Sequence, residues 1–189
     1  MKSLMDRITA SILDGFKTER SLDSLPRSEL FESFAGYCVI SNEYDDEFDS
    51  EDYRLGSSVD LGIDVSAIIV NGEIVSDKEE VRDLRGSSGF LSARIVLVQA
   101  KSSTNFEGKV ISDLTDNLID FFSESPALPM SAQLQDFKNA ISELYSNIGS
   151  FKRGLPELVV RFVTTGTWQE DSYIEGYSAG RVEVHGGYG

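Results

Sequence analysis

Three polar residues stand at the ends of apolar stretches in this 189-residue sequence, and their types suit a metal-dependent reaction. Asp64 follows Gly62 and Ile63 at the beginning of one apolar run, whereas Gln99 and Lys101 end another. Alternate residues of a strand share one face, so Gln99 and Lys101 should lie on the same side of it. A charged lysine that ends a buried strand is unfavourable unless it is paired or close to solvent. These positions are therefore the first candidates for a site.

This combination of side chains matches metal-assisted cleavage of a phosphodiester. An aspartate binds a hard divalent cation such as Mg²⁺ or Mn²⁺ through oxygen, and the carbonyl of a glutamine is a weaker oxygen ligand. A lysine nearby orients or deprotonates the attacking water, or neutralises negative charge that develops in the transition state. The segment between Asp64 and Gln99 leaves room for a hairpin and a short helix between neighbouring strands.

Composition excludes several other kinds of chemistry. Cys38 is the single cysteine and His185 the single histidine, which excludes a disulfide framework, a Cys-based zinc site and an HExxH motif, and disfavours a Ser-His-Asp triad. The phosphate-binding motifs GxGxxG and GxxxxGK[ST] are absent. No apolar run approaches the roughly 20 residues of a membrane helix, and the N-terminus does not resemble a secretory signal, so we expect a cytoplasmic protein without a membrane partner.

The charge balance is strongly acidic, with 32 acidic and 17 basic residues and a net charge of −15. Proteins that grip phosphates nonspecifically are normally basic. We therefore expect this chain alone to bind nucleic acid weakly, with the basic surface supplied by a longer chain or a partner. Residues 43–53 contain seven acids and no base, which predicts a solvated loop. An autoinhibitory mimic of phosphate is the alternative for this segment.

Hydrophobic periodicity and turn residues predict an α/β fold. Asn71-Gly72 is a strong hairpin signal, and Ser76 with Glu79 forms a capping box. The apolar strands over 93–99 and 158–164 should be neighbours in the interior of the sheet, with the helix from Pro26 packed on it. The predicted helices are 4–18, 26–42, 76–84, 109–122 and 131–150, and the predicted strands are 59–70, 73–75, 93–99 and 158–164, with 182–189 a further candidate.

Two short motifs resemble a known superfamily. Gly62-Ile63-Asp64 and Gln99-Ala100-Lys101 resemble the D…QxK variant of the PD-(D/E)XK, or restriction-endonuclease-like, superfamily, which Mrr-type nucleases carry. Phe31-Glu32 is similar to the Phe-Glu helix of that type, whose glutamate points into the site. The blocks LGIDVSAIIVNGEIV, VLVQAKSSTNFEG and FVTTGTW resemble the N-terminal region of abortive infection phage resistance (AIPR) proteins, over about 29–168.

The resemblance implies a restriction-endonuclease-like fold, in which helices flank both faces of a mixed β-sheet. It also implies a role for each matching residue. Asp64 would be the principal metal ligand, the Ala100 carbonyl a further ligand and Lys101 the catalytic lysine. Glu32 would support the metal directly or through water. Gln99 stands where most members of the superfamily have Asp or Glu, and a neutral ligand holds Mg²⁺ less strongly.

The implied function is that of a Mg²⁺-dependent endonuclease in prokaryotic phage defence by abortive infection, with DNA as the favoured substrate. The expected organisation is one domain over 1–189, with an N-terminal helix in 1–25, the core in 26–168 and an extension in 169–189. Family members are much longer, so we expect this chain to be the N-terminal part of a longer protein. Nucleases of this superfamily often form dimers, which makes a homodimer an expectation as well.

Each candidate residue also has a purely structural interpretation. Asp64 could cap a turn beside Gly62, and Asp60 competes with it as a ligand although it lies nearer the loop. Lys101 could be an ordinary charge at the end of a strand, and Glu32 a solvated helical glutamate. The polar segment 102–105 could contact phosphate or form a simple loop.

Two other functions remain open at the level of the whole chain. The first is a binding or scaffold module that keeps the fold without cleavage, which the acidic charge and Gln99 both favour. The second is an α/β protein outside the superfamily that interacts through its acidic face. Convergence of Asp64, Gln99 and Lys101 in space is the geometric requirement that separates the nuclease from the last of these.

Overall fold

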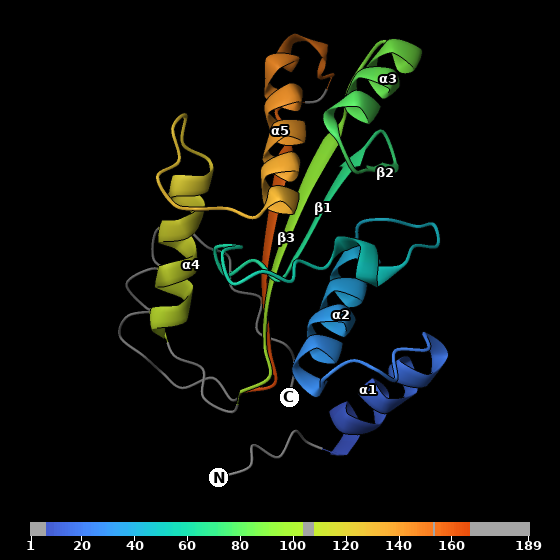
Figure 1. Ribbon diagram of the computed structural model, residues 1–189. Helices are drawn as coiled ribbons and strands as arrows, with labels where there is room; N and C mark the ends of the chain where they lie inside the picture. Colours follow the sequence, from blue (N-terminus) through green and yellow to red (C-terminus); the bar gives the residue numbers. More distant parts are fainter. Residues whose placement is uncertain (1–6, 104–107, 153, 167–189) are drawn as a thin grey trace.

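The computed structural model describes residues 7–103, 108–152 and 154–166, which form a four-stranded mixed sheet with helices on both faces (Figure 1). The strand order is β2-β1-β3-β4. Strand β1 pairs antiparallel with β2 and with β3, whereas β3 and β4 run parallel. The strands are β1 (Val65–Val70), β2 (Glu73–Val75), β3 (Ala93–Lys101) and β4 (Glu157–Thr164). This mixed α/β architecture is the coarse fold class that the sequence predicts.

Helices of different chain regions cover the two faces of the sheet. Helices α1 (Arg7–Glu19) and α2 (Arg27–Ile40) pack on one face, and α4 (Gly108–Phe121) and α5 (Ala132–Ser146) on the other (Figure 1). Helix α3 (Lys78–Ser88) packs beside α5. Two short 3₁₀ helices, η1 (Ser50–Tyr53) and η2 (Ile148–Ser150), complete the elements. Among the helices in the described residues, none has the length and apolar character needed to cross a bilayer.

Strand β3 supplies both halves of the core because its side chains alternate between the faces. Ile95 and Leu97 join the apolar cluster under α4 and α5, whereas Val96, Val98 and Ala100 join the cluster under α1 and α2. A strand buried on both faces needs a nearly continuous apolar sequence, which explains the run over 93–99. The sequence prediction of a central strand here is confirmed.

The first strand begins at Val65 and not at residue 59 as expected. Leu61 and Gly62 adopt the left-handed region, with φ of 59° and 78°. Two turn hydrogen bonds fold this segment: the Asp60 N–H donates to the Ser57 carbonyl, and the Ile63 N–H to that of Asp60. Although the β-branched composition of this run favours a strand from residue 59, the residues before Val65 form a turn that leads into β1.

Strand β4 lies next to β3, as expected, but it forms the edge of the sheet in the described part of the chain. The expectation that it lies in the interior is therefore wrong for these residues. Because β4 pairs with one strand only in the described residues, it is less covered than β3, and Leu158 is 45% exposed. The candidate strand 182–189 falls outside the described residues.

Helix α3 begins one residue later than the capping box predicts. Asp77, not Ser76, is its N-cap, and its carboxylate accepts a hydrogen bond from the Glu80 N–H. Glu80 in turn accepts a hydrogen bond from the Ser76 N–H. The helix continues beyond the predicted end at residue 84 to Ser88 and ends at Gly89, whose φ of 70° allows a left-handed cap.

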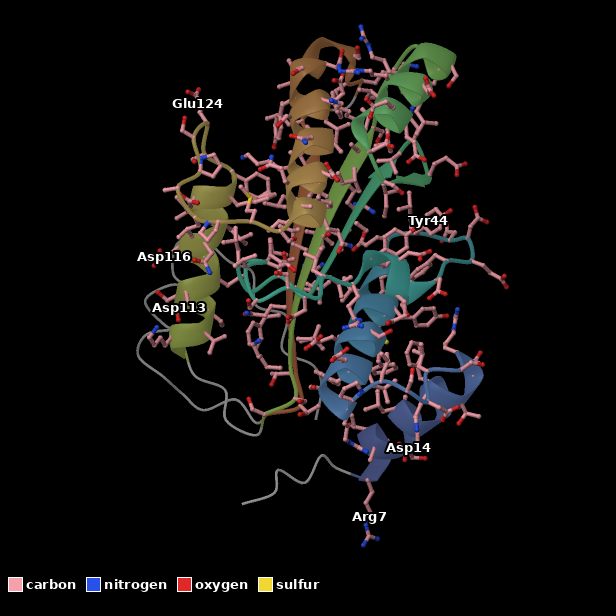
Figure 2. The ribbon with its side chains drawn as sticks, viewed as in Figure 1. Arg7, Asp14, Tyr44, Asp113, Asp116 and Glu124 are labelled. Carbon is pink, nitrogen blue, oxygen red and sulfur yellow. The ribbon has the colours of Figure 1, made fainter. Side chains whose placement is uncertain are left out.

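The acidic segment 43–53 is not simply a solvated loop, which corrects the sequence interpretation. Its aromatic residues pack against α2: the ring of Phe48 stacks on that of Tyr37 with centroids 5.4 Å apart. Tyr44, labelled in Figure 2, contacts Phe48 edge-on. Tyr53 contacts the same ring. The aromatic residues between the acids, and not the acids themselves, determine how this segment packs.

Helix α2 approaches the sheet closely at Gly36. A Cβ atom at this position would lie 2.7 and 2.9 Å from the two γ-carbons of Val65. The absence of a side chain at Gly36 is therefore what lets α2 lie this close to β1.

We predict that Gly36→Ala lowers the free energy of unfolding by about 1–3 kcal/mol, because the added methyl overpacks the contact with Val65. Gly15→Ala is the matched control, since Gly15 lies inside α1 with no atom within 4 Å of the new Cβ. This control should be neutral or stabilising by up to about 1 kcal/mol. Equal effects of the two changes in urea unfolding would contradict the prediction.

Candidate active site

Asp64 is fixed at the point where β1 begins. Its N–H donates to the Val98 carbonyl (2.8 Å), and its carbonyl accepts from the Leu55 N–H (2.8 Å). Its carboxylate accepts a hydrogen bond from the Ala100 N–H at 2.7 Å. The carboxylate therefore lies at the peptide between Gln99 and Ala100, immediately before Lys101. The antiparallel register of β1 and β3 brings the two sequence motifs together.

The environment of Asp64 disfavours a negative charge. Burial raises the pKa of its carboxyl group above the ordinary value of 3.8, and the nearby charge of Asp60 raises it further. The Ala100 N–H and the charge of Lys101 act in the opposite direction. Since burial dominates, an additional positive charge at this carboxylate would be stabilising.

Gln99 is almost fully buried, with 5% of its surface exposed. Its amide packs on the main chain of Gly62, where an added Cβ would lie 2.8 Å from Nε2. Its Oε1 is buried and has no hydrogen-bond partner among the described residues. A buried acceptor without a donor costs about 1–3 kcal/mol, so this oxygen is suited to a cation or a water molecule.

Asp60, the competing candidate, lies in the turn before β1 and is 3% exposed. One carboxylate oxygen accepts the Ser57 N–H at 2.8 Å, which gives Asp60 a structural role in the turn. The other oxygen is buried without a partner in the described part of the chain. Asp60 therefore contributes negative charge beside Asp64 as well as holding the turn.

Lys101 ends β3 and is half-buried. Its carbonyl accepts the Thr165 N–H at 3.2 Å, which ties the end of β3 to the residue after β4. Its side-chain charge lowers the pKa of both Asp64 and Glu32. None of the ion pairs between described residues involves Lys101.

Glu32 reaches the same region from α2. Burial raises the pKa of its carboxyl group, and the charge of Asp64 raises it further, whereas Arg54 and Lys101 lower it. Helix α2 covers the face that carries Ala100, while strand alternation directs Gln99 to the opposite face. Glu32 therefore comes from the face of the sheet that α2 covers, whereas Gln99 belongs to the opposite face.

Arg54 also belongs to this site, and it is not among the residues predicted from the sequence. Its guanidinium lies 3.0 Å from Glu29, 3.2 Å from Glu51 and 3.8 Å from Glu32. The available signal was its position as the first base after the acidic segment 43–53. That signal does not reveal which carboxylates it meets, because two of them lie on α2.

The carboxylates alone do not form a complete metal site. Among the described residues, no three His, Cys, Asp or Glu side chains gather closely enough to hold an ion. A cation would need Asp64 together with neutral oxygens such as those of Gln99 and the Ala100 carbonyl. Two surface hollows, one beside Phe121 and Lys138 and one beside Asn71 and Phe90, lie away from these residues.

Comparisons with protein-family models, curated proteins and solved structures find no match to this chain.

The raised pKa of Asp64 predicts a pH-dependent effect of Asp64→Asn in metal-free buffer. The folded protein holds this proton more tightly than the unfolded chain, so ionisation of Asp64 destabilises the fold. The stability of the wild type should therefore fall relative to the Asn variant as pH rises from about 4 towards 7. Asparagine keeps an acceptor for the Ala100 N–H, which Asp64→Ala would remove.

Asp120→Asn provides an internal control of opposite sign. The N–H groups of Ala127 and Leu128 lower the pKa of Asp120, so its ionised form stabilises the fold. The wild type should gain stability over this variant as pH rises through the lowered pKa towards the unfolded value. Thermal melts that extend from below the lowered pKa of Asp120 up to a pH of about 7 measure both differences, because the change for Asp120 lies below its unfolded pKa of 3.8 and the change for Asp64 lies above the same value. A difference for Asp64→Asn that does not change with pH would contradict its prediction.

Proposed function

We propose that this chain is a metal-dependent nuclease domain of the restriction-endonuclease-like type, acting in prokaryotic phage defence by abortive infection. The observation that carries the proposal is the hydrogen bond that the Ala100 N–H donates to the Asp64 carboxylate, together with the buried Gln99 oxygen that has no partner among the described residues. This geometry joins the two motifs on which the resemblance rests. The antiparallel neighbours β1 and β3 are compatible with that fold.

The donor atoms suit Mg²⁺ or Mn²⁺, which prefer oxygen ligands. Asp64 and the Gln99 amide oxygen would hold the ion, with the Ala100 carbonyl as a further ligand and Glu32 acting directly or through water. Burial raises the pKa of both carboxyl groups, and a cation would relieve this unfavourable charge. When bound, the ion would polarise the phosphate and lower the pKa of a water molecule.

The protein residues would have separate roles in the reaction. Lys101 would orient the attacking water and neutralise charge that develops on the phosphate in the transition state. Asp64 would fix the reacting centre at the end of β3. Gln99, as a neutral ligand, would make the site dependent on a high concentration of metal. These roles describe hydrolysis of a phosphodiester bond in nucleic acid, with DNA as the proposed substrate.

The partners follow from the charge. With a net charge of −15, this chain should bind DNA weakly, and additional chain or a second protein should supply the basic surface. A homodimer would bring two sites to the two strands of a duplex.

We predict that cleavage of DNA or RNA requires Mg²⁺ or Mn²⁺ and both motifs. Asp64→Asn should abolish cleavage and weaken Mn²⁺ binding, whereas Lys101→Ala should lower the cleavage rate by about 100-fold or more while sparing metal binding. Gln99→Glu should tighten Mn²⁺ binding, because a carboxylate replaces a neutral oxygen. Isothermal titration and gel assays measure these effects.

Asp116→Asn is the matched control, because it makes the same chemical change on an exposed position of α4 that points away from the sheet (Figure 2). It should leave the metal response and cleavage unchanged. If Mn²⁺ raises the melting temperature of the wild type and of Asp64→Asn equally, Asp64 is not the ligand and the nuclease proposal fails.

A binding module without cleavage is the second candidate, and Gln99 is the observation that favours it. Since no three carboxylates gather here in the described residues, the site would hold a cation weakly. In that case Mn²⁺ would bind through Asp64, but neither the wild type nor Gln99→Glu would cut DNA or RNA.

A further inference from the structure

We propose that Arg54 is a positioning residue of this site: Glu29 and Glu51 hold its guanidinium in place, and its fixed charge holds Glu32 beside Asp64 and limits how strongly a divalent cation binds. This inference rests on the proposed function, because it concerns the same metal site.

The contacts of Arg54 divide into two tight ion pairs and one loose one. Nη1 lies 3.0 Å from Glu29 and Nε lies 3.2 Å from Glu51, whereas Glu32 is 3.8 Å from Nη1. The Arg54 side chain is only 16% exposed, so these pairs are shielded from solvent more than ordinary surface pairs. Glu29 and Glu51 therefore fix the guanidinium, and Glu32 is attracted without being fully engaged.

The main chain places Arg54 beside the reacting centre. Arg54 forms an isolated antiparallel bridge with Val65, and the next residue, Leu55, donates its N–H to the Asp64 carbonyl. From α5, the Gln133 amide donates to the Arg54 carbonyl at 3.3 Å. Strand β2 pairs only with residues 68–70 of β1, so this segment takes its place along the first part of β1. The position of Arg54 is thereby tied to that of Asp64.

Electrostatics gives this arrangement a consequence for metal binding. The carboxylates of Glu32 and Asp64 repel one another. Without a metal, the charges of Arg54 and Lys101 offset their negative charge. A bound cation would neutralise the two carboxylates in place of these basic groups. The positive charge of Arg54 would repel that cation. Removing the charge of Arg54 should strengthen cation binding, but it should also release Glu32 from its position.

Arg54→Gln tests this balance. In metal-free buffer the variant should melt at a lower temperature than the wild type, and Mn²⁺ should raise its melting temperature by more. The Mn²⁺ dissociation constant should fall by about 3- to 10-fold, because a repulsive charge is gone. The kcat of cleavage should fall at the same time, whereas damage to the fold alone would weaken metal binding as well.

Two variants serve as controls. Arg54→Lys keeps the charge but cannot bridge several carboxylates with one rigid fork, so the Mn²⁺ dissociation constant should stay within about twofold while kcat falls. Arg82→Gln removes an exposed arginine of α3 that pairs with Glu143 of α5 and with none of the site's carboxylates, and it should leave the Mn²⁺ response unchanged. Adding Glu32→Gln to Arg54→Gln should reduce the excess effect of Mn²⁺, because the carboxylate that Arg54 no longer neutralises is then absent as well.

The outcomes separate this inference from the proposed function. If Mn²⁺ stabilises the wild type but not Asp64→Asn, and Arg54→Gln responds like the wild type, the inference about Arg54 is wrong and the metal site stands. If Mn²⁺ does not stabilise the wild type, or if it stabilises the wild type and Asp64→Asn alike, the proposed function fails. If Arg54→Gln folds only with Mn²⁺, the inference is supported; if it does not fold at all, an unchanged kcat in Arg54→Lys overturns the inference.

Discussion

The antiparallel register between β1 and β3 is the constraint on which the candidate site depends. Val65 pairs with Val98, and this pairing brings the carboxylate of Asp64 to the Ala100 N–H. A slip of one residue would exchange the two faces of β1 and place Asp64 away from Gln99. The close contact of Val65 with Gly36 makes such a slip unfavourable, because it leaves no room for a side chain of another shape. The packing of the apolar core thus determines which residues meet at the end of these two strands.

Around this pairing, the protein places negative charge where it is poorly solvated. Asp64 and Glu32 both have raised pKa values because burial outweighs the opposing interactions. Lys101 and Arg54 supply the nearby positive charge. Basic residues are the minority in this chain, which has a net charge of −15, yet two of them act on these carboxylates. Such clusters of perturbed groups are common at functional sites, although structural ion pairs also produce them.

The elements that the sequence predicted well are those whose burial pattern is strong. The apolar run of β3 and the Asn71-Gly72 hairpin each appear where their local signals indicate. The beginning of β1 was mispredicted because left-handed Leu61 is not visible in a β-branched composition. Asp64 and Lys101 could be selected from their types, but their separation in space follows from strand pairing. Arg54 was missed because its partners on α2 are distant in sequence.

The close packing of α2 on β1 ties two positions of the chain to one another. Gly36 has no room for a side chain because Val65 fills the space above it. A relative with alanine or serine at the position of Gly36 would therefore need a smaller residue in place of Val65. Substitutions at these two sites should appear together during divergence, and neither position is free to drift alone.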